Sequence, residues 1–505
     1  MRQLAATAGF AVALLLLLQC MATLSGWVTR GQLVHDAREA LATLHNGEPR
    51  WHWRLEQRSD LVARRVFGAA DLHAEPDGLR ITSQDGRPFE LGLPVAEPID
   101  LAHWPMLRLN MRSDSAGVVG LVYQTSESGT ACRATHAAQF APADTSLTID
   151  LRAAAWQGDT GGPCQPPGVV SYMLRLQVEV PAKSTLTIQG AALTSPQAMP
   201  LPAAIDANRA DIRLPATGQP DALATNTREQ ERYAAPVVRL PDHASAEAML
   251  SLRDRVMAQW PAAIILPYGQ SIAASHDGRM PAWLDWGACS LYLAGLFWLA
   301  LRQKPGIIRP WIEVAAIAAG PLWLIAGLRW GPQLSVPGVI AFVAALVYGG
   351  QSEWRRRPVP WSWWTNRWKD WLWPLLPLPV AGILTLADGH GLIHLDAKHV
   401  LAYLGWALLQ QWAMLALVMG RLRHTQLPQP VILLITATLF GLLHTPNGTL
   451  MQLCLLAELW WAWCFTRSPR LVPMALAHAA SALLVEAGLT GHLLRSLGVS
   501  ARFFL

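Results

Sequence analysis

Apolar segments long enough to cross a bilayer lie at both ends of this chain, and they constrain its fold more than any other feature. A helix needs about 20 apolar residues to span the hydrocarbon core. The first such segment runs from Leu4 to Leu24. Eight more follow from residue 284 to the C-terminus, at 286–302, 311–328, 335–350, 371–387, 400–420, 430–445, 449–465 and 471–489. The sequence therefore predicts a polytopic helical membrane domain over 284–505, a bundle of about eight helices.

The first apolar segment has two interpretations. Residues 1–29 could form a signal-anchor helix, which their length favours, or a cleaved secretory signal, because Cys20-Met21-Ala22 could precede a cleavage point. Both interpretations export the residues that follow.

Charge and composition narrow the class of protein further. The chain is 52% hydrophobic and 15% charged, whereas soluble domains carry about 25% charged residues. These values exclude an ordinary soluble enzyme and a disordered chain. The net charge of +5 does not indicate a nucleic-acid partner, because the basic residues gather in alternate loops between the apolar segments: 302–309, 355–369, 421–423 and 467–470.

Alternation of this kind orients a membrane protein. Basic loops stay in the cytoplasm, so residues 30–283 are predicted on the periplasmic or extracellular side. The expected location is the inner (plasma) membrane, crossed several times, with membrane lipid as a partner.

Within the exported domain predicted at 30–195, residues 78–195 have a different hydrophobic period. Apolar and polar residues alternate at 107–111, 147–151 and 174–180, and clusters of Gly, Pro and Asp separate these runs. Period two with one apolar face indicates half-buried strands. Several such strands predict an exported all-β sandwich, jelly-roll-like. Its aromatic residues are scattered along the sequence and form no clear platform for stacking on a sugar. The hypothesis is a recognition module that binds substrate, or a glycan or envelope partner.

Two cysteines lie in this exported region, Cys132 and Cys164, both in Gly- and Thr-rich loops. An oxidising compartment favours a disulfide between them; two free thiols are the alternative. Residues 196–283 follow as a proline-rich connector, in which 245–260 has the spacing of an amphipathic helix that ends at Pro261.

Polar side chains inside the apolar segments are expected to have a structural or functional role, because burying them in a bilayer is costly. Each one alone is explained by a hydrogen bond between helices. Three segments together form a pattern: Gln410-Gln411 on one, Phe440 and His444 in FGLLHTPN on the next, and His478 on a third.

This pattern resembles the CAAX-protease and bacteriocin-processing (Abi-type) family of intramembrane glutamic or metallo-proteases, over roughly residues 400–490. The family has a Glu-Glu-x-x-x-Arg helix, a Phe-x-x-x-His helix and a His-x-x-x-Asn helix. The resemblance implies a helical membrane bundle that cleaves a membrane protein or peptide. It also implies that the first glutamate and His444 activate water, and that His478 stabilises the oxyanion.

The chain departs from the family at several motif positions. Gln410 and Gln411 replace the glutamates, Leu415 the arginine and Ala482 the asparagine. Glutamine has no basicity toward water, and a general base contributes roughly 10²–10⁴-fold in rate. Either another group replaces the base, with Glu486, Glu458 and His444 as candidates, or the protein is a catalytically inactive pseudoprotease that acts as a scaffold or substrate-binding partner.

Two further hypotheses stay open. Imidazoles and carboxylates in one loop could hold a divalent metal such as zinc: Asp388, His390, His394, Asp396 and His399. A solvated polar loop explains them better, because they lack a tight ligand spacing such as HExxH. A transporter or envelope-polysaccharide factor would also combine a sandwich with a bundle, but the sequence has no repeat symmetry to favour it.

Overall fold

The computed structural model describes residues 2–95, 99–125, 130–158, 162, 164, 171–195, 202–214, 235–274, 282–302, 306–328, 335–388, 392 and 394–489. Its contacts divide the chain into two compact units. One unit holds Met1–Gln32, Ser245–Leu250 and Asp277–Leu505, and the other holds Leu33–Ala244 and Ser251–His276.

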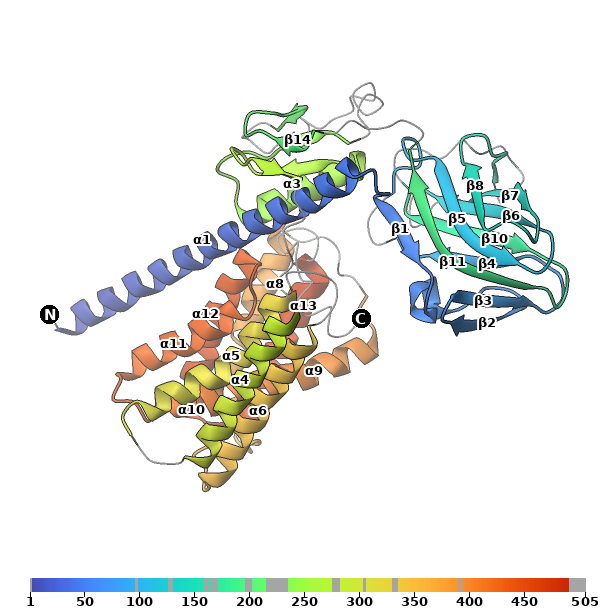
Figure 1. Ribbon diagram of the computed structural model, residues 1–505. Coiled ribbons are helices and arrows are strands. Elements are labelled where there is room, and N and C mark those ends of the chain that lie inside the picture. Colours follow the sequence, from blue (N-terminus) through green and yellow to red (C-terminus); the bar gives the residue numbers. More distant parts are fainter. Residues whose placement is uncertain are drawn as a thin grey trace. The chain divides into compact units, whose positions relative to one another are not determined.

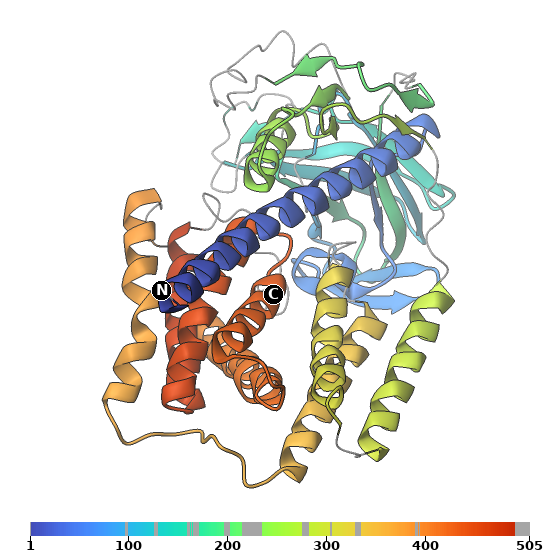
Figure 2. The same cartoon turned by 90° about the vertical axis from the view of Figure 1, so that its left-hand side faces the viewer.

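The first unit is a helical bundle (Figures 1 and 2). Its helices are α4 (Ala282–Leu301), α5 (Arg309–Leu328), α6 (Val336–Arg355), α7 (Lys369–Leu372), α8 (Pro377–Asp388), α9 (Ala397–Gln411), α10 (Met419–Leu422), α11 (Gln429–Leu442), α12 (Gly448–Arg467) and α13 (Leu471–Leu489). A 3-10 turn, Trp373–Leu375, joins α7 to α8, and a π-helical stretch, Trp412–Val418, joins α9 to α10. These helices cover the eight predicted segments.

Five helices among the described residues are long and apolar enough to cross a membrane: Ala5–His45, Trp283–Leu301, Lys369–Ala387, Ala397–Leu422 and Leu471–Leu489. The chain is therefore a multi-pass membrane protein. Helices α5, α6 and α12 belong to the same bundle and carry the buried Glu313, Glu353 and Glu458. These carboxylates need polar partners inside the bundle.

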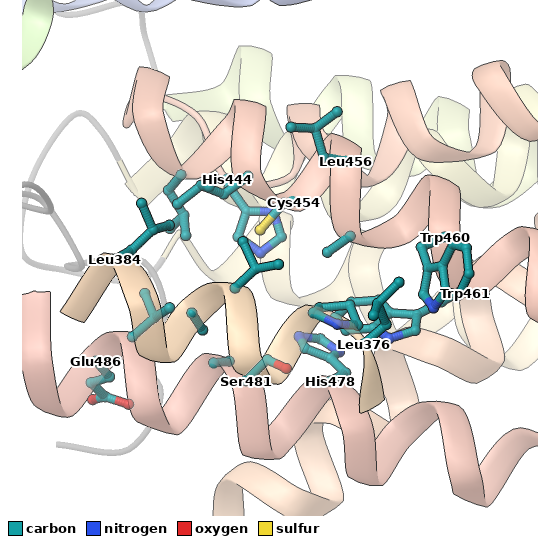
Figure 3. Close-up of a pocket in the computed structure, with 18 of the residues that line it drawn as sticks. Leu376, Leu384, His444, Cys454, Leu456, Trp460, Trp461, His478, Ser481 and Glu486 are labelled. Carbon is teal, nitrogen blue, oxygen red and sulfur yellow. The ribbon is translucent and has the colours of Figure 1, made fainter. Parts of the chain in front are cut away.

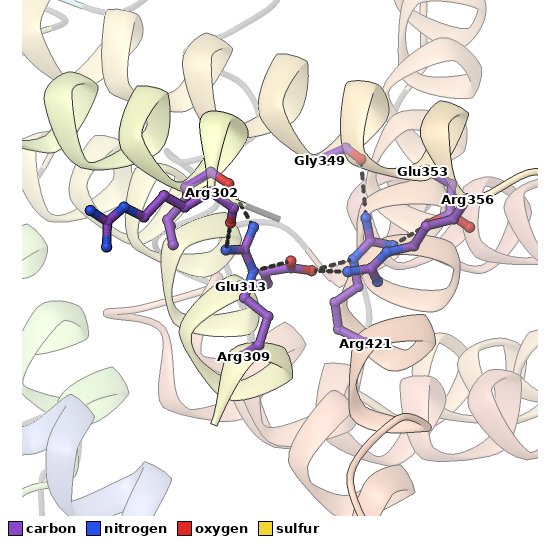
Figure 4. A network of polar contacts seen from close by, with 8 residues as sticks. Arg302, Arg309, Glu313, Gly349, Glu353, Arg356 and Arg421 are labelled. Atoms are coloured by element: carbon purple, nitrogen blue, oxygen red, sulfur yellow. Dashed lines mark hydrogen bonds and ion pairs between the residues drawn. The ribbon is translucent and has the colours of Figure 1, made fainter. Parts of the chain in front are cut away.

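A buried ionic cluster joins α5, α6 and α10 (Figure 4). Glu313 accepts from Arg309 at 2.7 Å and from Arg356 at 2.6 Å, and its carboxylate lies 3.3 Å from Nε of Arg421. Arg421 also pairs with Glu353 and is 1% exposed. Arg421 thus lies on α10, paired with two carboxylates, and not in the basic loop where the sequence placed it.

Helix α1 (Arg2–His45) continues well beyond the apolar segment. Its first part packs on α11 and α12, where Met21 contacts the buried Ala437 and Met451. Gln452 donates to the carbonyl oxygen of Leu18 at 3.0 Å. Beyond residue 32 the helix belongs to the second unit, where Ala37, Leu41 and Leu44 are buried at helical spacing.

The second unit contains the predicted sandwich of two antiparallel sheets. One has the order β2-β3-β11-β5-β8, with β1 also paired to β11, and the other has the order β4-β10-β6-β7-β9. Their bounds are β1 Trp51–Arg54, β2 Ala70–Glu75, β3 Gly78–Ser83, β4 Phe89–Leu93, β5 Met106–Ser113, β6 Gly117–Gln124, β7 Cys132–Phe140, β8 Ser146–Asp150, β9 Gln157–Gly158, β10 Met173–Glu179 and β11 Thr185–Thr194.

Residues of both sheets form one core, in which Leu109, Leu121 and Leu176 are fully buried. The alternating residues predicted to face inward do so, because successive side chains of a strand point to opposite faces. Cys132 of β7 forms a disulfide with Cys164, with Cα atoms 5.9 Å apart.

The proline-rich connector carries more structure than its composition predicted. Short strands β13 (Ile212–Arg213), β14 (Val237–Arg239) and β15 (Ile264–Leu266) form a parallel sheet, and β12 (Ala204–Ile205) pairs with β16 (Ile272–Ala273). Helix α3 (Ala246–Gln259) covers the predicted amphipathic segment. The buried Arg239 organises this region by donating to the carbonyl oxygens of Asp206, Arg209 and Gln270.

Candidate functional site

His444 lies in the turn between α11 and α12 and is 7% exposed. Its Nδ1 is 2.9 Å from the carbonyl oxygen of Phe440, one turn earlier. A carbonyl can only accept, so Nδ1 carries the proton and Nε2 of the neutral ring keeps its lone pair. Asn447 begins α12 by accepting from the backbone N–H of Leu450 at 2.9 Å. The HTPN segment therefore holds His444 so that its Nε2 can accept a proton.

His478 lies in the middle of α13 and is 3% exposed. Its ring packs edge-on against Phe440, with centroids 5.4 Å apart, and near Trp461 at 5.0 Å. Phe440 also contacts the ring of His444, at 4.9 Å. One phenyl ring therefore lies against both imidazoles and fixes their spacing.

Gln411 connects His478 to a carboxylate. Its Nε2 donates to Oε2 of Glu458 at 2.8 Å and lies 3.4 Å from Nδ1 of His478. All three side chains are buried. Since an amide N–H donates, Nδ1 of His478 accepts, and its proton lies on Nε2. The two histidines thus have opposite tautomers: His444 offers an acceptor at Nε2 and His478 a donor.

The neighbouring Gln410 belongs to a different enclosure. It lines a smaller cavity of about 60 Å³, together with Trp406, Leu443 and His444. Adjacent residues of a helix point about 100° apart, so the two glutamines cannot both reach Glu458. The π-helical stretch begins at Trp412, directly after the pair, and π-helical segments are frequent at functional sites.

A larger cavity of about 250 Å³ contains both imidazoles (Figure 3). Its walls come mainly from α8, α12 and α13 and are mostly apolar, including Leu376, Leu384 and Trp460. Ser481 lines it with a buried hydroxyl that has no hydrogen-bond partner within the described chain. Ala482, at the family's asparagine position, also lines it. The hydroxyl one residue earlier is thus a further polar group at the cavity wall.

The other candidates have different surroundings. Glu486 lines the same cavity, and its carboxylate lies 3.1 Å from Nε2 of His399. Leu415, at the family's arginine position, is fully buried in the apolar core. The side chain of Asp388 and residue His390 lie outside the described residues. Among those described, no group of three or more His, Cys, Asp or Glu could hold a metal ion.

The arrangement has the parts of a hydrolytic site. Nε2 of His444 can take a proton from water, and Nε2–H of His478 can stabilise a developing oxyanion. The amide of Gln411, itself bonded to Glu458, contacts Nδ1 of His478 and thereby orients the imidazole ring. Sequence reasoning named all four residues but could not pair Gln411 with Glu458. The sequence signal for this pairing was Glu458 itself, a single carboxylate in the apolar helix α12 that needs a polar partner.

Comparison with known proteins supports the resemblance. Residues 361–484 match the model of a family described as Rce1-like, type II CAAX prenyl endopeptidase Rce1-like. No curated protein sequence matches the chain.

Two solved structures of carbohydrate binding modules each match about 29% of the chain. A mutant of the family 29 carbohydrate binding module CBM29-2 is 11% identical, with a TM-score of 0.19 and 86% of its own length covered. A low-affinity xylan binding module, CBM86 from Roseburia intestinalis, is 13% identical, with a TM-score of 0.19 and 94% covered. Likeness at this level carries no argument about ligands.

Proposed function

With residues 361–484 matching the Rce1-like family of CAAX prenyl endopeptidases, we propose that the protein is an intramembrane endopeptidase whose general base is His444. The observation that carries this proposal is the pair of buried imidazoles, His444 and His478, that line one cavity. The substrate is a membrane protein or a peptide, because the cavity walls are apolar.

The reaction needs only groups that the cavity holds, and water. Nε2 of His444 accepts a proton as water attacks the peptide carbonyl carbon, and Nε2–H of His478 donates to the oxyanion. The tetrahedral intermediate then collapses, the C–N bond breaks, and the imidazolium of His444 returns its proton to the leaving amine. Glu458 stays behind Gln411 as a positioning residue, since its contact is with the amide and not with the substrate cavity.

The test is a cleavage assay on the full-length protein in nanodiscs, with a panel of tagged single-span membrane proteins. His444→Ala should abolish cleavage, and His478→Ala should lower kcat by roughly 10²–10³-fold, as loss of an oxyanion donor does. His424→Ala is the matched control, because His424 is exposed in the loop after α10. Full cleavage by the His444→Ala variant would overturn the proposal.

A pseudoprotease that acts as a membrane scaffold is the second candidate, favoured by Gln410, Gln411 and Ala482 at motif positions. It predicts that no panel member is cleaved and that cells carrying His444→Ala together with His478→Ala behave as wild type. Deletion of the whole chain would still produce a phenotype. Cleavage that depends on His444 excludes this candidate.

The exported position of residues 30–283 and the domain boundaries at 29, 195 and 283 remain part of this proposal. The alternation of basic loops supports the orientation, and a glycan or envelope partner for the sandwich stays a hypothesis.

A further inference from the structure

The second unit contains a cavity of about 500 Å³ at some distance in sequence from the histidines. Its walls come from the last turns of α1, from β1, from the segment after β4 and from α3 with the residues that follow it. Its floor is apolar, with Leu33, Ala37 and Ile265 buried. The volume falls within the roughly 300–1,000 Å³ typical of ligand sites.

The cavity lies along the edge of β1. Four consecutive residues line it, Arg50 through Trp53. Successive side chains of a strand point to opposite faces, so a cavity over one face would contact only alternate residues. A cavity that contacts all four lies beside the backbone. Trp51, Trp53 and Leu55 turn their backbone groups toward β11, so His52, which lines the cavity, turns its backbone N–H and C=O toward the opposite edge.

This other edge of β1 has no backbone partner in the part of the chain that the structure describes. An edge strand presents a row of unpaired N–H and C=O groups, and these pair readily with another extended chain. Such a row matches the repeat of a peptide backbone, with a hydrogen-bonding position at every second residue.

The side chains around the cavity are already oriented. Nε1 of Trp53 donates to the carbonyl oxygen of Pro94 at 2.8 Å, and the ring of Trp51 packs edge-on against Trp104 at 5.6 Å. Asp36, Arg50 and Arg253 at the rim each have an interaction within the protein. The rim charges are therefore engaged, and an uncharged apolar group fits the interior best.

We propose that this cavity binds an extended peptide by strand addition to β1, with one large apolar side chain of the peptide inserted over Leu33 and Ala37. The main chain supplies the affinity and the cavity supplies the specificity, as in other edge-strand recognition. The proposal does not depend on the peptidase activity. If both hold, the site recruits the extramembrane segment of a substrate.

The test uses full-length protein in nanodiscs and a biotinylated library of decapeptides, in which threonine alternates with randomised residues. Peptides with one large apolar residue should be enriched. N-methylation of alternate amides in an enriched peptide should weaken binding by about tenfold or more, because it removes two or more hydrogen bonds. Ala40→Trp, which fills the cavity from α1, should abolish binding. Ala143→Trp, at an exposed turn between β7 and β8, should not.

Three results would overturn the proposal. The first is a library with no enriched sequence, and the second is an N-methylated peptide that binds as well as its parent. The third is binding of maltoheptaose, lost in Ala40→Trp, without peptide binding, which would make the cavity a saccharide site. None of these results bears on cleavage at His444, so the two proposals fail separately.

Discussion

Because Gln411 and Glu458 contact each other across two helices, mutation can exchange the amide and the carboxyl group between the two positions. In the family motif the carboxylate lies on the helix of Gln411, whereas here a carboxylate lies opposite, on α12. The variant Gln411→Glu alone would place two carboxylates where Nε2 and Oε2 are now 2.8 Å apart. The double variant Gln411→Glu with Glu458→Gln restores one amide and one carboxylate with their positions exchanged.

The expected magnitudes follow from burial, since both side chains are 0% exposed. Gln411→Glu replaces a buried hydrogen bond, worth about 0.5–1.5 kcal/mol, with a contact between two buried carboxyl groups that cannot both be ionised, so the free energy of unfolding should fall by at least that amount. The double variant should recover all but about 1 kcal/mol. Contacting residues have coupling energies of about 0.5–3 kcal/mol.

The assay is a double-mutant cycle in detergent, followed by tryptophan fluorescence during denaturant titration, with cleavage measured in parallel. Gln410→Glu is the matched control, because Gln410 faces the smaller cavity. Additive effects of the two substitutions would refute the inference that Gln411 and Glu458 act as a pair. A double variant with faster cleavage would indicate that the carboxylate works best on α9.

Three other predictions concern the bundle and the sandwich. Arg421→Met should lower the free energy of unfolding by about 3–5 kcal/mol, because it removes the guanidinium that pairs with Glu353 and one of the three guanidinium groups at Glu313; the exposed Arg367→Met should change little in the same denaturation assay. Gly448→Ala should disturb the start of α12, because a Cβ there would meet Ser25 Oγ at 2.9 Å and Glu247 Oε1 at 3.0 Å, and a lower free energy of unfolding in the same denaturation assay would detect the disturbance. Ser146→Cys, in a background without Cys20, should react with a membrane-impermeant maleimide in intact cells; labelling only after permeabilisation would reverse the predicted orientation.

The apolar segments and the two-residue period determined the fold class from the sequence alone. Both signals are local: a helix in lipid must satisfy its own backbone hydrogen bonds, and a half-buried strand must alternate. The histidine of FGLLHTPN and His478 could be named for the same reason, since each belongs to a short motif.

Contacts between segments could not be read from these patterns. Sequence reasoning treated Gln410 and Gln411 as one motif and counted Arg421 as a loop charge. The tertiary structure sends the two glutamines into different enclosures, joins Gln411 to Glu458 and His478, and buries Arg421 between two glutamates. The connector strands and the open edge of β1 were also invisible, because pairing depends on which segments meet. Periodicity specifies which face of a helix or strand is buried, but only packing decides which partner each buried polar group finds.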